Sequence, residues 1–323
     1  MSKVGLILHA PCRLHFGLLA RGPGNHRQHG GLGLMVREPC LEIKAEPDRR
    51  WSVQGPAAAR ANELVSRIRA RLVQAGIEPA PSRITILQAP PEHVGLGSGT
   101  QLALGLARLL LELAGHSEAD VVFMAGLTGR GKRSGIGLHG FHQGGLIVDG
   151  GHGEGTDVPP LLARLPFPDD WSILLVRPDA APGRHGTSED QAFAALPPIE
   201  PRETDLYCRL VLLNLLPAVI ERDLASFGSA LTELQKQIGA GYAAGQGGVY
   251  GSPRAAEILE SLGSLGFVGL GQSSWGPTLY GFSDRPRDEI EAATHELARR
   301  HGLESDAIMR THADNDGAQV RRS

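Results

Sequence analysis

Residues 89–113, which read APPEHVGLGSGTQLALGLARLLLEL, place the strongest constraint on how this 323-residue chain folds. Pro90 and Pro91 exclude regular structure at the start of the stretch, and a Gly-rich turn over residues 95–100 follows them. Leucines then recur at helical spacing as far as Leu113, which is typical of a helix buried along one face. The stretch predicts a tight turn that leads directly into a core helix.

The start of this helix is a candidate anion site. Glycines let the backbone approach a ligand closely, and Ser98 or Thr100 can cap the helix. The first turn of a helix presents unpaired N–H groups and the positive end of the dipole, which suits phosphate or pyrophosphate. The predicted phosphate-binding residues of this turn are Gly95, Gly97, Ser98, Gly99 and Thr100. A tight turn without a ligand has the same composition, so the turn alone does not decide the function.

Two familiar phosphate-binding loops do not fit this turn. No Gly-Lys-Ser/Thr sequence closes it, which excludes a P-loop. The G-x-G-x-x-G spacing of dinucleotide-binding folds is also missing, and Pro90, Pro91 and Glu92 stand where a buried strand would end.

The composition narrows the class of protein. An apolar fraction of 41% and a charged fraction of 21% are typical of a globular protein large enough for two domains. The net charge of −3 provides no strong basic field, so we expect small-molecule substrates and neither nucleic acid nor membrane partners. Cys12, Cys40 and Cys208 show no metal-ligand or redox spacing, which favours a cytoplasmic location. The apolar run over residues 4–8 is too short for a signal or membrane segment.

Hydrophobic periodicity predicts a mixed α and β chain with a boundary in the Pro-rich segment 159–170. The expected domains are residues 1–165 and 166–323. Strands are predicted over residues 4–9, 10–19, 40–45, 82–88, 141–149 and 171–177, with loops over 21–31 and 178–186. Helices are predicted over residues 60–75, 117–127 (capped by Ser117), 204–222, 223–238, 255–262 and 287–301, and a last strand and turn over 307–320.

Three small-residue segments stand in a familiar order: 11–33 with Arg13, 91–100, and 269–276, which contains a Gly-x-Gly-x-Ser sequence. They resemble the three motifs of the GHMP superfamily of small-molecule kinases, and the resemblance spans nearly the whole chain. It implies a two-domain α+β fold, with an N-terminal half like domain 2 of ribosomal protein S5 and a ferredoxin-like C-terminal half.

One departure from the GHMP kinases bears on the activity. Kinases of this superfamily that use a catalytic base typically read Ser-Gly-x-Asp before a Gly-Gly pair. Here Gly137 stands at the aspartate position of the sequence that begins at Ser134, and Gly144 and Gly145 follow at the same spacing. A glycine cannot take a proton from a hydroxyl nucleophile, which weakens a kinase interpretation. Some kinases of the superfamily also lack this aspartate.

A closer resemblance is to the β-ribofuranosylaminobenzene 5′-phosphate synthase family. That family joins phosphoribosyl pyrophosphate to 4-aminobenzoate, with loss of CO2 and pyrophosphate, in methanopterin biosynthesis, and some members are assigned 4-hydroxybenzoate. The family often has an acidic residue in the first segment where this chain has Ala20. The matching residues are RLHF at 13–16, HVGLGSGTQ at 93–101, GRG at 129–131, RSGIG at 133–137, GGLIVDGG at 144–151 and QSSWGP at 272–277.

This resemblance implies roles for residues in the matching segments and beside them. Arg13, His15 and Arg27 are the predicted catalytic residues, because a substrate carboxylate and a leaving pyrophosphate both need positive or hydrogen-bonding partners. Lys132, Arg133 and Ser134 join the Gly-rich turn as predicted phosphate ligands. Ser273, Ser274 and Trp275 are predicted to line the aromatic or ribose pocket. Each of these side chains could also have a purely structural role, as a core histidine, a solvated loop charge or a turn residue.

Mg2+ is the expected counter-charge, and the sequence does not identify its ligands. Asp149 and Asp157 offer carboxylates, although both also suit turns. The sequence therefore predicts a decarboxylating phosphoribosyltransferase, acting as a homodimer like many proteins of the superfamily. An ATP-dependent kinase or a non-catalytic protein that binds a phosphorylated metabolite are the alternatives.

Overall fold

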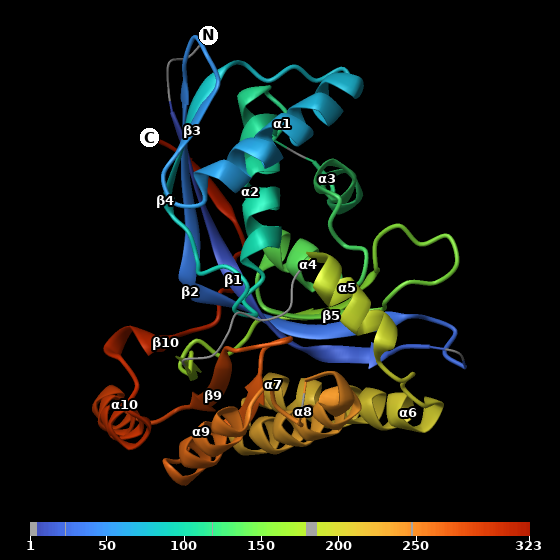
Figure 1. Cartoon of the computed structure of the whole chain (residues 1–323), viewed down its shortest axis with the longest axis vertical. Coiled ribbons are helices and arrows are strands. Elements are labelled where there is room, and N and C mark those ends of the chain that lie inside the picture. The colour runs from blue at the N-terminus through green and yellow to red at the C-terminus, as the bar shows by residue number, and fades with distance from the viewer. Residues whose placement is uncertain (1–4, 23, 118, 179–185, 247) are drawn as a thin grey trace.

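The computed structural model describes residues 5–323 apart from 23, 118, 179–185 and 247, and it shows two sheets flanked by helices (Figure 1). The larger, 7-stranded sheet belongs to the N-terminal half and has the order β11-β1-β2-β4-β3, with β5 pairing with β2 and β6 pairing with β5. Its strands are β1 (Leu6–Ala20), β2 (His29–Pro47), β3 (Ser52–Gln54), β4 (Ser82–Gln88), β5 (Leu146–Asp149), β6 (Leu161–Leu165) and β11 (Gln319–Arg322).

Helices cover one face of the upper part of this sheet (Figure 1). The Leu-rich helix α2 packs against β1, β2 and α1, and its buried leucines form one core with the sheet. Leu104, Leu106 and Leu109 have no exposed surface. The helices of this half are α1 (Ala58–Gln74), α2 (Ser98–Leu113), α3 (Val121–Thr128) and α4 (Ile136–Gln143).

The C-terminal half contains a 4-stranded sheet of order β10-β7-β9-β8. Its strands are β7 (Ser172–Val176), β8 (Val268–Gln272), β9 (Leu279–Ser283) and β10 (Ile308–Thr311). Its helices are α5 (Gly186–Ala195), α6 (Pro201–Leu210), a π-helical turn (Val211–Leu215), α7 (Leu216–Glu221), α8 (Leu224–Gln246), α9 (Pro253–Ser264), α10 (Arg287–His301) and a 3-10 turn (Ser305–Ala307).

Strands β1 and β2 pass through both halves of the molecule. Leu8 and Ile43 belong to the core beneath α1 and α2, whereas Phe16 and Leu34 belong to a second core with Tyr280 and the helices α6–α8. The β1–β2 register shifts twice, between Pro11 and Cys12 and between His15 and Gly17. A bulge of this kind bends a strand and turns its side chains, and here it sets the direction of the residues between the two cores.

The α+β class and most elements are as predicted, and several boundaries differ. The segments predicted as two strands and a loop form one long strand, β1, and an early start of β2 at His29, because β11, β2 and β5 supply hydrogen-bonding partners along their length. The last predicted strand divides into β10 and β11 around a turn. Val4 and residues 179–185 of the predicted loop lie outside the described residues.

Both predicted helix caps were wrong. Gly97 is the N-cap of α2 at φ 71, and neither Ser98 nor Thr100 makes a side-chain cap bond. The left-handed turn at Gly97 places its carbonyl to accept the N–H groups of Thr100 and Gln101, which closes the first turn without a side chain. Asp120, three residues after Ser117, caps α3 by accepting the N–H of Phe123 at 2.7 Å.

The division into residues 1–165 and 166–323 stays a prediction. The end of the chain returns to the first sheet, where β11 pairs with β1 from Leu6 to His9. Asp314 also pairs with the first half, since its N–H donates to the carbonyl of Met35 and its carbonyl accepts the N–H of Gly145.

Gly144 allows the C-terminal segment to pack against the first sheet, and a substitution at Gly144 tests this packing. Gly144 has φ 61 and ψ −169, a conformation that only glycine adopts readily, and an added Cβ would lie 2.4 Å from the carbonyl carbon of Asn315. We expect Gly144→Ala to lower the free energy of unfolding by about 2–3 kcal/mol or more in urea titration. Gly126→Ala is the matched control: it lies within α3 with no neighbour inside 4 Å, and it should leave stability unchanged or raise it by about 0.5–1 kcal/mol. Equal effects of the two substitutions would contradict this packing.

Candidate functional site

The three motif segments meet around Ser273, although they are far apart in the sequence. The Ser273 hydroxyl donates to the Gly95 carbonyl at 2.7 Å and accepts the backbone N–H of His15 at 3.0 Å. The Ser274 N–H donates to the His15 carbonyl at 3.1 Å, and the Arg13 N–H donates to the Leu96 carbonyl at 3.1 Å. The Gly-rich turn, strand β1 and the turn between β8 and β9 are therefore held together by direct hydrogen bonds.

The glycines of the central turn let it pack closely on two arginines. A Cβ added at Gly97 would lie 2.8 Å from the Cγ of Arg13, and one added at Gly99 would lie 2.3 Å from a guanidinium nitrogen of Arg60. The Arg13 guanidinium also donates to the Gly95 carbonyl at 3.1 Å. The start of α2 and the Arg13 side chain therefore form one positively polarised surface.

A cavity of about 450 Å³ lies beside this junction, between the two halves of the chain. Its floor comes from β1 and its sides come from the 129–134 loop, α8 and the turn after β8. Its lining residues are Arg13, His15, Phe16, Gly17, Leu18, Thr100, Gly129, Arg130, Gly131, Lys132, Arg133, Ser134, Phe193, Gln235, Ile238, Gly239, Tyr242, Val249, Tyr250, Gln272, Ser274 and Trp275.

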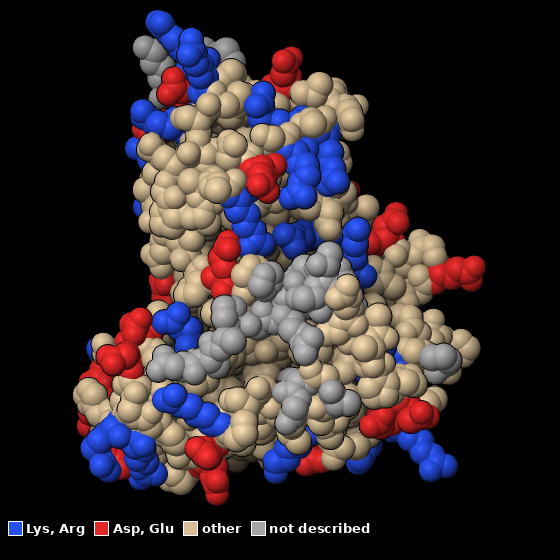
Figure 2. Space-filling view, viewed as in Figure 1, with Lys and Arg blue, Asp and Glu red and all other residues tan. Residues whose placement is uncertain are grey.

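The cavity is strongly cationic. Arg13, Arg130, Lys132 and Arg133 line it, and no Asp or Glu is among its described lining residues. On the face shown in Figure 2, Lys and Arg side chains also gather around α1 and α3, above the junction of the two halves. With four cations and no carboxylate among the described residues that line it, the cavity suits a small molecule with several negative charges, even though the chain as a whole has a net charge of −3.

A buried hydrogen-bonded chain connects the cavity floor to Asp149. The Gly17 N–H donates to Nδ1 of His15 at 3.2 Å, so a neutral His15 has its proton on Nε2. Nε2 lies 3.1 Å from Oγ of Ser134, and that hydroxyl donates to Oδ2 of Asp149 at 3.2 Å. The N–H groups of Gly135 and Gly151 also donate to this carboxylate, at 2.8 and 2.9 Å. The orientation of His15 is thus fixed at both ring nitrogens.

The electrostatics keep His15 neutral. Burial lowers the pKa of His15 well below its ordinary 6.5, and the positive charges of Arg13 and Arg133 lower it further. Burial raises the pKa of Asp149, which has no exposed surface, while the Gly151, Gly135 and Ser134 donors oppose that rise. The site therefore presents an uncharged, oriented imidazole among fixed cations.

Aromatic side chains form one wall of the cavity. Phe193 contacts Trp275 and Tyr242 edge to face, with ring centroids 5.3 and 6.1 Å apart. The Arg133 guanidinium lies 4.5 Å from the centroid of the Phe193 ring. An aromatic or sugar ring would thus have flat surfaces to pack on beside the cationic loop.

The structure brings together many of the predicted site residues. Those that line the cavity are Arg13, His15, Thr100, Lys132, Arg133, Ser134, Ser274 and Trp275. Ser273 is fully buried behind them, where it holds the motif segments together. Gly95, Gly97, Ser98 and Gly99 lie in the adjoining turn and are not among the lining residues.

Arg27 lies away from the cavity lining. Its guanidinium donates to the carbonyls of Gly150 and Gly151, at 2.5 and 2.8 Å. These contacts hold the segment after β5, so they support a structural role, and the prediction of a catalytic role is not supported by its position. Asp149, expected in a turn or as a metal ligand, is instead the buried acceptor for Ser134.

Sequence reasoning missed several lining residues. Arg130 stands in the same basic loop as Lys132 and Arg133, so that loop's charge was the available signal. Phe193, Gln235, Tyr242 and Tyr250 come from α5, from α8 and from the segment after α8, none of which contains a recognisable motif.

Gly137 is buried in the first turn of α4. A side chain added there would require its neighbours to shift. Its carbonyl accepts the Nε2 amide hydrogen of Gln101 at 3.2 Å, and an added Cβ would lie 3.1 Å from Cγ2 of Thr100. A side chain at this position would therefore stand in tight contact with the first turn of α2.

Comparison with known proteins defines the class first. The GHMP kinases N terminal domain family matches residues 61–140, and the GHMP kinases C terminal family matches residues 215–302. Phosphomevalonate kinase from Streptococcus pneumoniae superposes with a TM-score of 0.71 at 12% identity over 100% of both chains. Homoserine kinase from Cytophaga hutchinsonii superposes with a TM-score of 0.69 at 17% identity over 99% of this chain and 98% of that one. At these identities the likeness establishes the GHMP kinase fold alone.

The curated relatives define the family. A β-ribofuranosylphenol 5′-phosphate synthase from Archaeoglobus fulgidus is 33% identical, over 98% of this chain and 99% of that protein. A protein of the same name from Methanothermobacter thermautotrophicus is 30% identical, over 91% and 93%. The chain belongs to the β-ribofuranosylphenol 5′-phosphate synthase family and is an enzyme. Among the residues the structure describes, no helix is long and apolar enough to cross a membrane.

The chain from Asp149 through Ser134 to His15 should matter for turnover more than for folding. We expect Ser134→Ala to lower kcat by about 10- to 100-fold, because it leaves a buried carboxylate and the Nε2–H of His15 without their shared partner. Ser264→Ala is the control, since the Ser264 hydroxyl donates to the Ser261 carbonyl away from the cavity, and its kcat should be unchanged. Steady-state kinetics on both variants measures this, and an unaffected Ser134→Ala enzyme would contradict the role.

The low pKa of His15 predicts a stability that depends on pH. Below the ordinary value of 6.5, the unfolded chain binds a proton at His15 that the folded chain does not. The stability that depends on a neutral His15 is therefore present above the ordinary pKa of 6.5 and is lost progressively as pH falls below it. In urea unfolding, His15→Gln should flatten this dependence, whereas the exposed His116→Gln should not. An unchanged slope in His15→Gln would contradict a buried neutral His15.

Proposed function

We propose that this enzyme joins phosphoribosyl pyrophosphate to a 4-substituted benzoate with loss of CO2 and pyrophosphate, in methanopterin biosynthesis. The observation that carries the proposal is the cavity itself, in which four cations and no described lining carboxylate stand beside an aromatic wall. The family membership supports the same reaction class, a pentosyl transfer. One substrate is a polyanion and the other is a flat ring, and the cavity offers a surface for each.

The cationic side suits the leaving pyrophosphate. As the bond between C1 of the ribose and the pyrophosphate oxygen breaks, the electron pair and negative charge move onto pyrophosphate. Fixed positive groups stabilise that charge without having to reorganise. Arg13, Lys132 and Arg133 are the residues we assign to this task, with Arg130 beside them. Arginine suits it because its planar fork binds two phosphate oxygens at once.

The aromatic side suits the ring. The ring carbon that bears the carboxylate attacks C1, which forms the carbon–carbon bond, and loss of CO2 returns its electron pair to the ring and restores aromaticity. A carboxylate held by a strong ion pair would resist leaving as CO2. Neutral His15 and the Ser134 hydroxyl can orient polar atoms of the substrate without adding charge. We assign packing of the ring to Phe193, Tyr242 and Trp275.

The choice between two acids rests on the relatives. Their name specifies a phenol product, which supports 4-hydroxybenzoate as the acid for this chain. The sequence motifs leave both acids open, so 4-aminobenzoate is the alternative, and it differs only in the group at the far end of the ring.

Mg2+ remains part of the proposal as the counter-ion of phosphoribosyl pyrophosphate. The described lining residues do not form a Mg2+ site of their own, because they include no carboxylate and Asp149 is already bound by three donors. Mg2+ would therefore enter with the substrate, and none of the steps above depends on a protein-bound ion.

A kinase activity is the less favoured alternative, because Gly137 offers no catalytic base. We also propose a cytoplasmic homodimer. The three cysteines are free thiols, which fits a reducing compartment. Leu212, Leu213 and Ile220 are each more than 60% exposed around α7, which suits burial against a second copy.

Release of labelled CO2 tests the reaction directly. The enzyme with Mg2+ and phosphoribosyl pyrophosphate should release CO2 from carboxyl-labelled 4-hydroxybenzoate, and the same assay with 4-aminobenzoate ranks the two acids. We expect Arg133→Ala to lower kcat/KM by about 100-fold or more through lost stabilisation of the leaving group. Arg49→Ala, an exposed arginine before β3, is the matched control and should retain full activity.

Two outcomes would overturn the proposal. Absence of CO2 release with both acids, together with ATP-dependent phosphorylation of a small alcohol, would favour a kinase activity instead. Absence of activity with every substrate would favour a protein that binds a phosphorylated metabolite without transforming it.

A further inference from the structure

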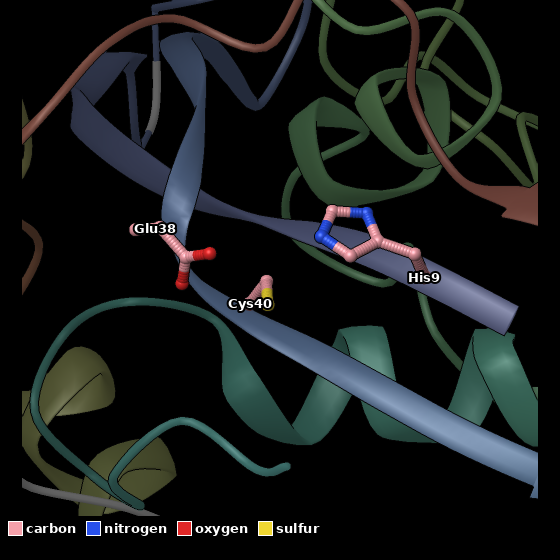
Figure 3. Close-up of side chains that lie close together, drawn as sticks. All are labelled: His9, Glu38 and Cys40. Carbon is pink, nitrogen blue, oxygen red and sulfur yellow. The ribbon is translucent and has the colours of Figure 1, made fainter. Parts of the chain in front are cut away.

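Three side chains with metal-binding atoms lie together outside the cavity, as Figure 3 shows. His9 comes from β1, and Glu38 and Cys40 come from β2. One ligand atom from each residue lies within 4.8 Å of the other two. None of the three is among the described lining residues of the cavity, so the proposed transferase reaction does not account for this cluster.

The strand register explains why these residues meet. Pro11 pairs with Cys40 but Cys12 pairs with Val36, so residues 37–39 of β2 bulge out of the ladder. The bulge brings Glu38 back beside Cys40. His9 stands two residues before Pro11, and residues two apart on a strand share a face, which makes His9 the diagonal neighbour of Cys40. The sequence spacing of the cysteines gave no sign of a metal site, because its ligands come from two strands and a bulge.

We propose that His9, Glu38 and Cys40 bind one Zn2+ ion, with water as the fourth ligand. A thiolate, an imidazole and a carboxylate are the ligand types that zinc uses in proteins. With zinc–ligand distances of about 2.0–2.3 Å, tetrahedral ligand atoms stand about 3.3–3.8 Å apart, so three ligand atoms within 4.8 Å of one another need at most a small movement to bind one ion. The Glu38 side chain is exposed and can make that movement, whereas Cys40 is 4% exposed and anchors the site.

The Glu38 carboxylate has a hydrogen-bonding partner on the neighbouring strand β4. The Gln88 side-chain amide donates to a Glu38 carboxylate oxygen at 3.4 Å. Metal-bound histidines and carboxylates are usually supported by outer partners of this kind.

The position predicts a structural role for the ion. The Glu38 N–H donates to Oγ1 of Thr311 at 2.9 Å, and Val36 bridges to Ala313, so the C-terminal segment crosses β2 at this bulge. Zinc would fix β1 and the β2 bulge to each other where that segment crosses. It should therefore raise the melting temperature of the whole chain, because the unfolded chain does not hold the three ligands together.

Direct metal binding tests the proposal without an activity assay. Chelator-treated protein, titrated with Zn2+ in a calorimeter, should bind one equivalent. Co2+ in place of Zn2+ should give the near-ultraviolet absorption of a cobalt–thiolate bond. Losing even an outer partner costs about 10- to 100-fold in metal affinity, so losing a direct ligand should weaken Zn2+ binding by about 100-fold or more.

Matched variants identify the ligands. Cys40→Ser should abolish the cobalt–thiolate absorption, whereas Cys208→Ser, at an exposed cysteine, should keep it. His9→Gln and Glu38→Gln should weaken Zn2+ binding, whereas His116→Gln should not. His9 and Glu38 are less buried than Cys40, so these two variants decide the matter if Cys40→Ser fails to fold. Failure of the wild-type chain to bind Zn2+, or undiminished binding in both His9→Gln and Glu38→Gln, would overturn the site.

Discussion

The Ser273 hydroxyl is the contact on which the arrangement of the site depends. It is fully buried, it donates to the Gly95 carbonyl and it accepts the N–H of His15, so a single oxygen joins all three motif segments. Removal of this hydroxyl would leave the buried N–H of His15 without a partner, at a cost of about 1–3 kcal/mol, and would leave the Gly95 carbonyl with the Arg13 guanidinium alone. Strand β1, the start of α2 and the turn after β8 therefore hold fixed positions around the cavity.

This arrangement places fixed positive charges and an uncharged imidazole in one small cavity. Arg13 lies against the start of α2 and adds its charge to the helix dipole, while Lys132 and Arg133 face it from the loop before α4. His15 stands among these cations and is kept neutral by burial and by their charges. A reaction in which one product leaves as a polyanion and the other as uncharged CO2 requires such a division. The chain thus has the GHMP kinase fold, with Gly137 packed against Thr100 and Gln101 of α2.

The sequence predicted the features that depend on local pattern. The Leu stripe identified α2, helical periodicity placed α10 over residues 287–301, and the three motif segments indicated the fold and family. The cap of α2 could not be predicted in this way, because Gly97 closes the helix through a left-handed backbone conformation and needs no side chain. The role of Arg27 could not be decided either, since its charge and its neighbouring glycines suit both a phosphate site and the hydrogen bonds to backbone carbonyls that it makes.

The remaining site residues depend on long-range contacts. Phe193 and Tyr242 reach the cavity only because α5 and α8 pack across the junction, and no spacing in the sequence records that. Asp149 looked like a turn residue, and its role as acceptor for Ser134 appears only when β5 pairs with β2. The cluster of His9, Glu38 and Cys40 likewise depends on a shift in strand register that the residue order does not encode in any simple pattern.

The most direct test of this account is a crystal structure of the enzyme with pyrophosphate, the product that carries the charge. We expect pyrophosphate in the cavity between the start of α2 and the 129–134 loop, with its oxygens in contact with Arg13 and Arg133. His15 should stay hydrogen-bonded to Ser134, as in the free enzyme. Pyrophosphate bound elsewhere, with the guanidinium groups of Arg13 and Arg133 turned away from it, would contradict the central claim that these cations receive the leaving group.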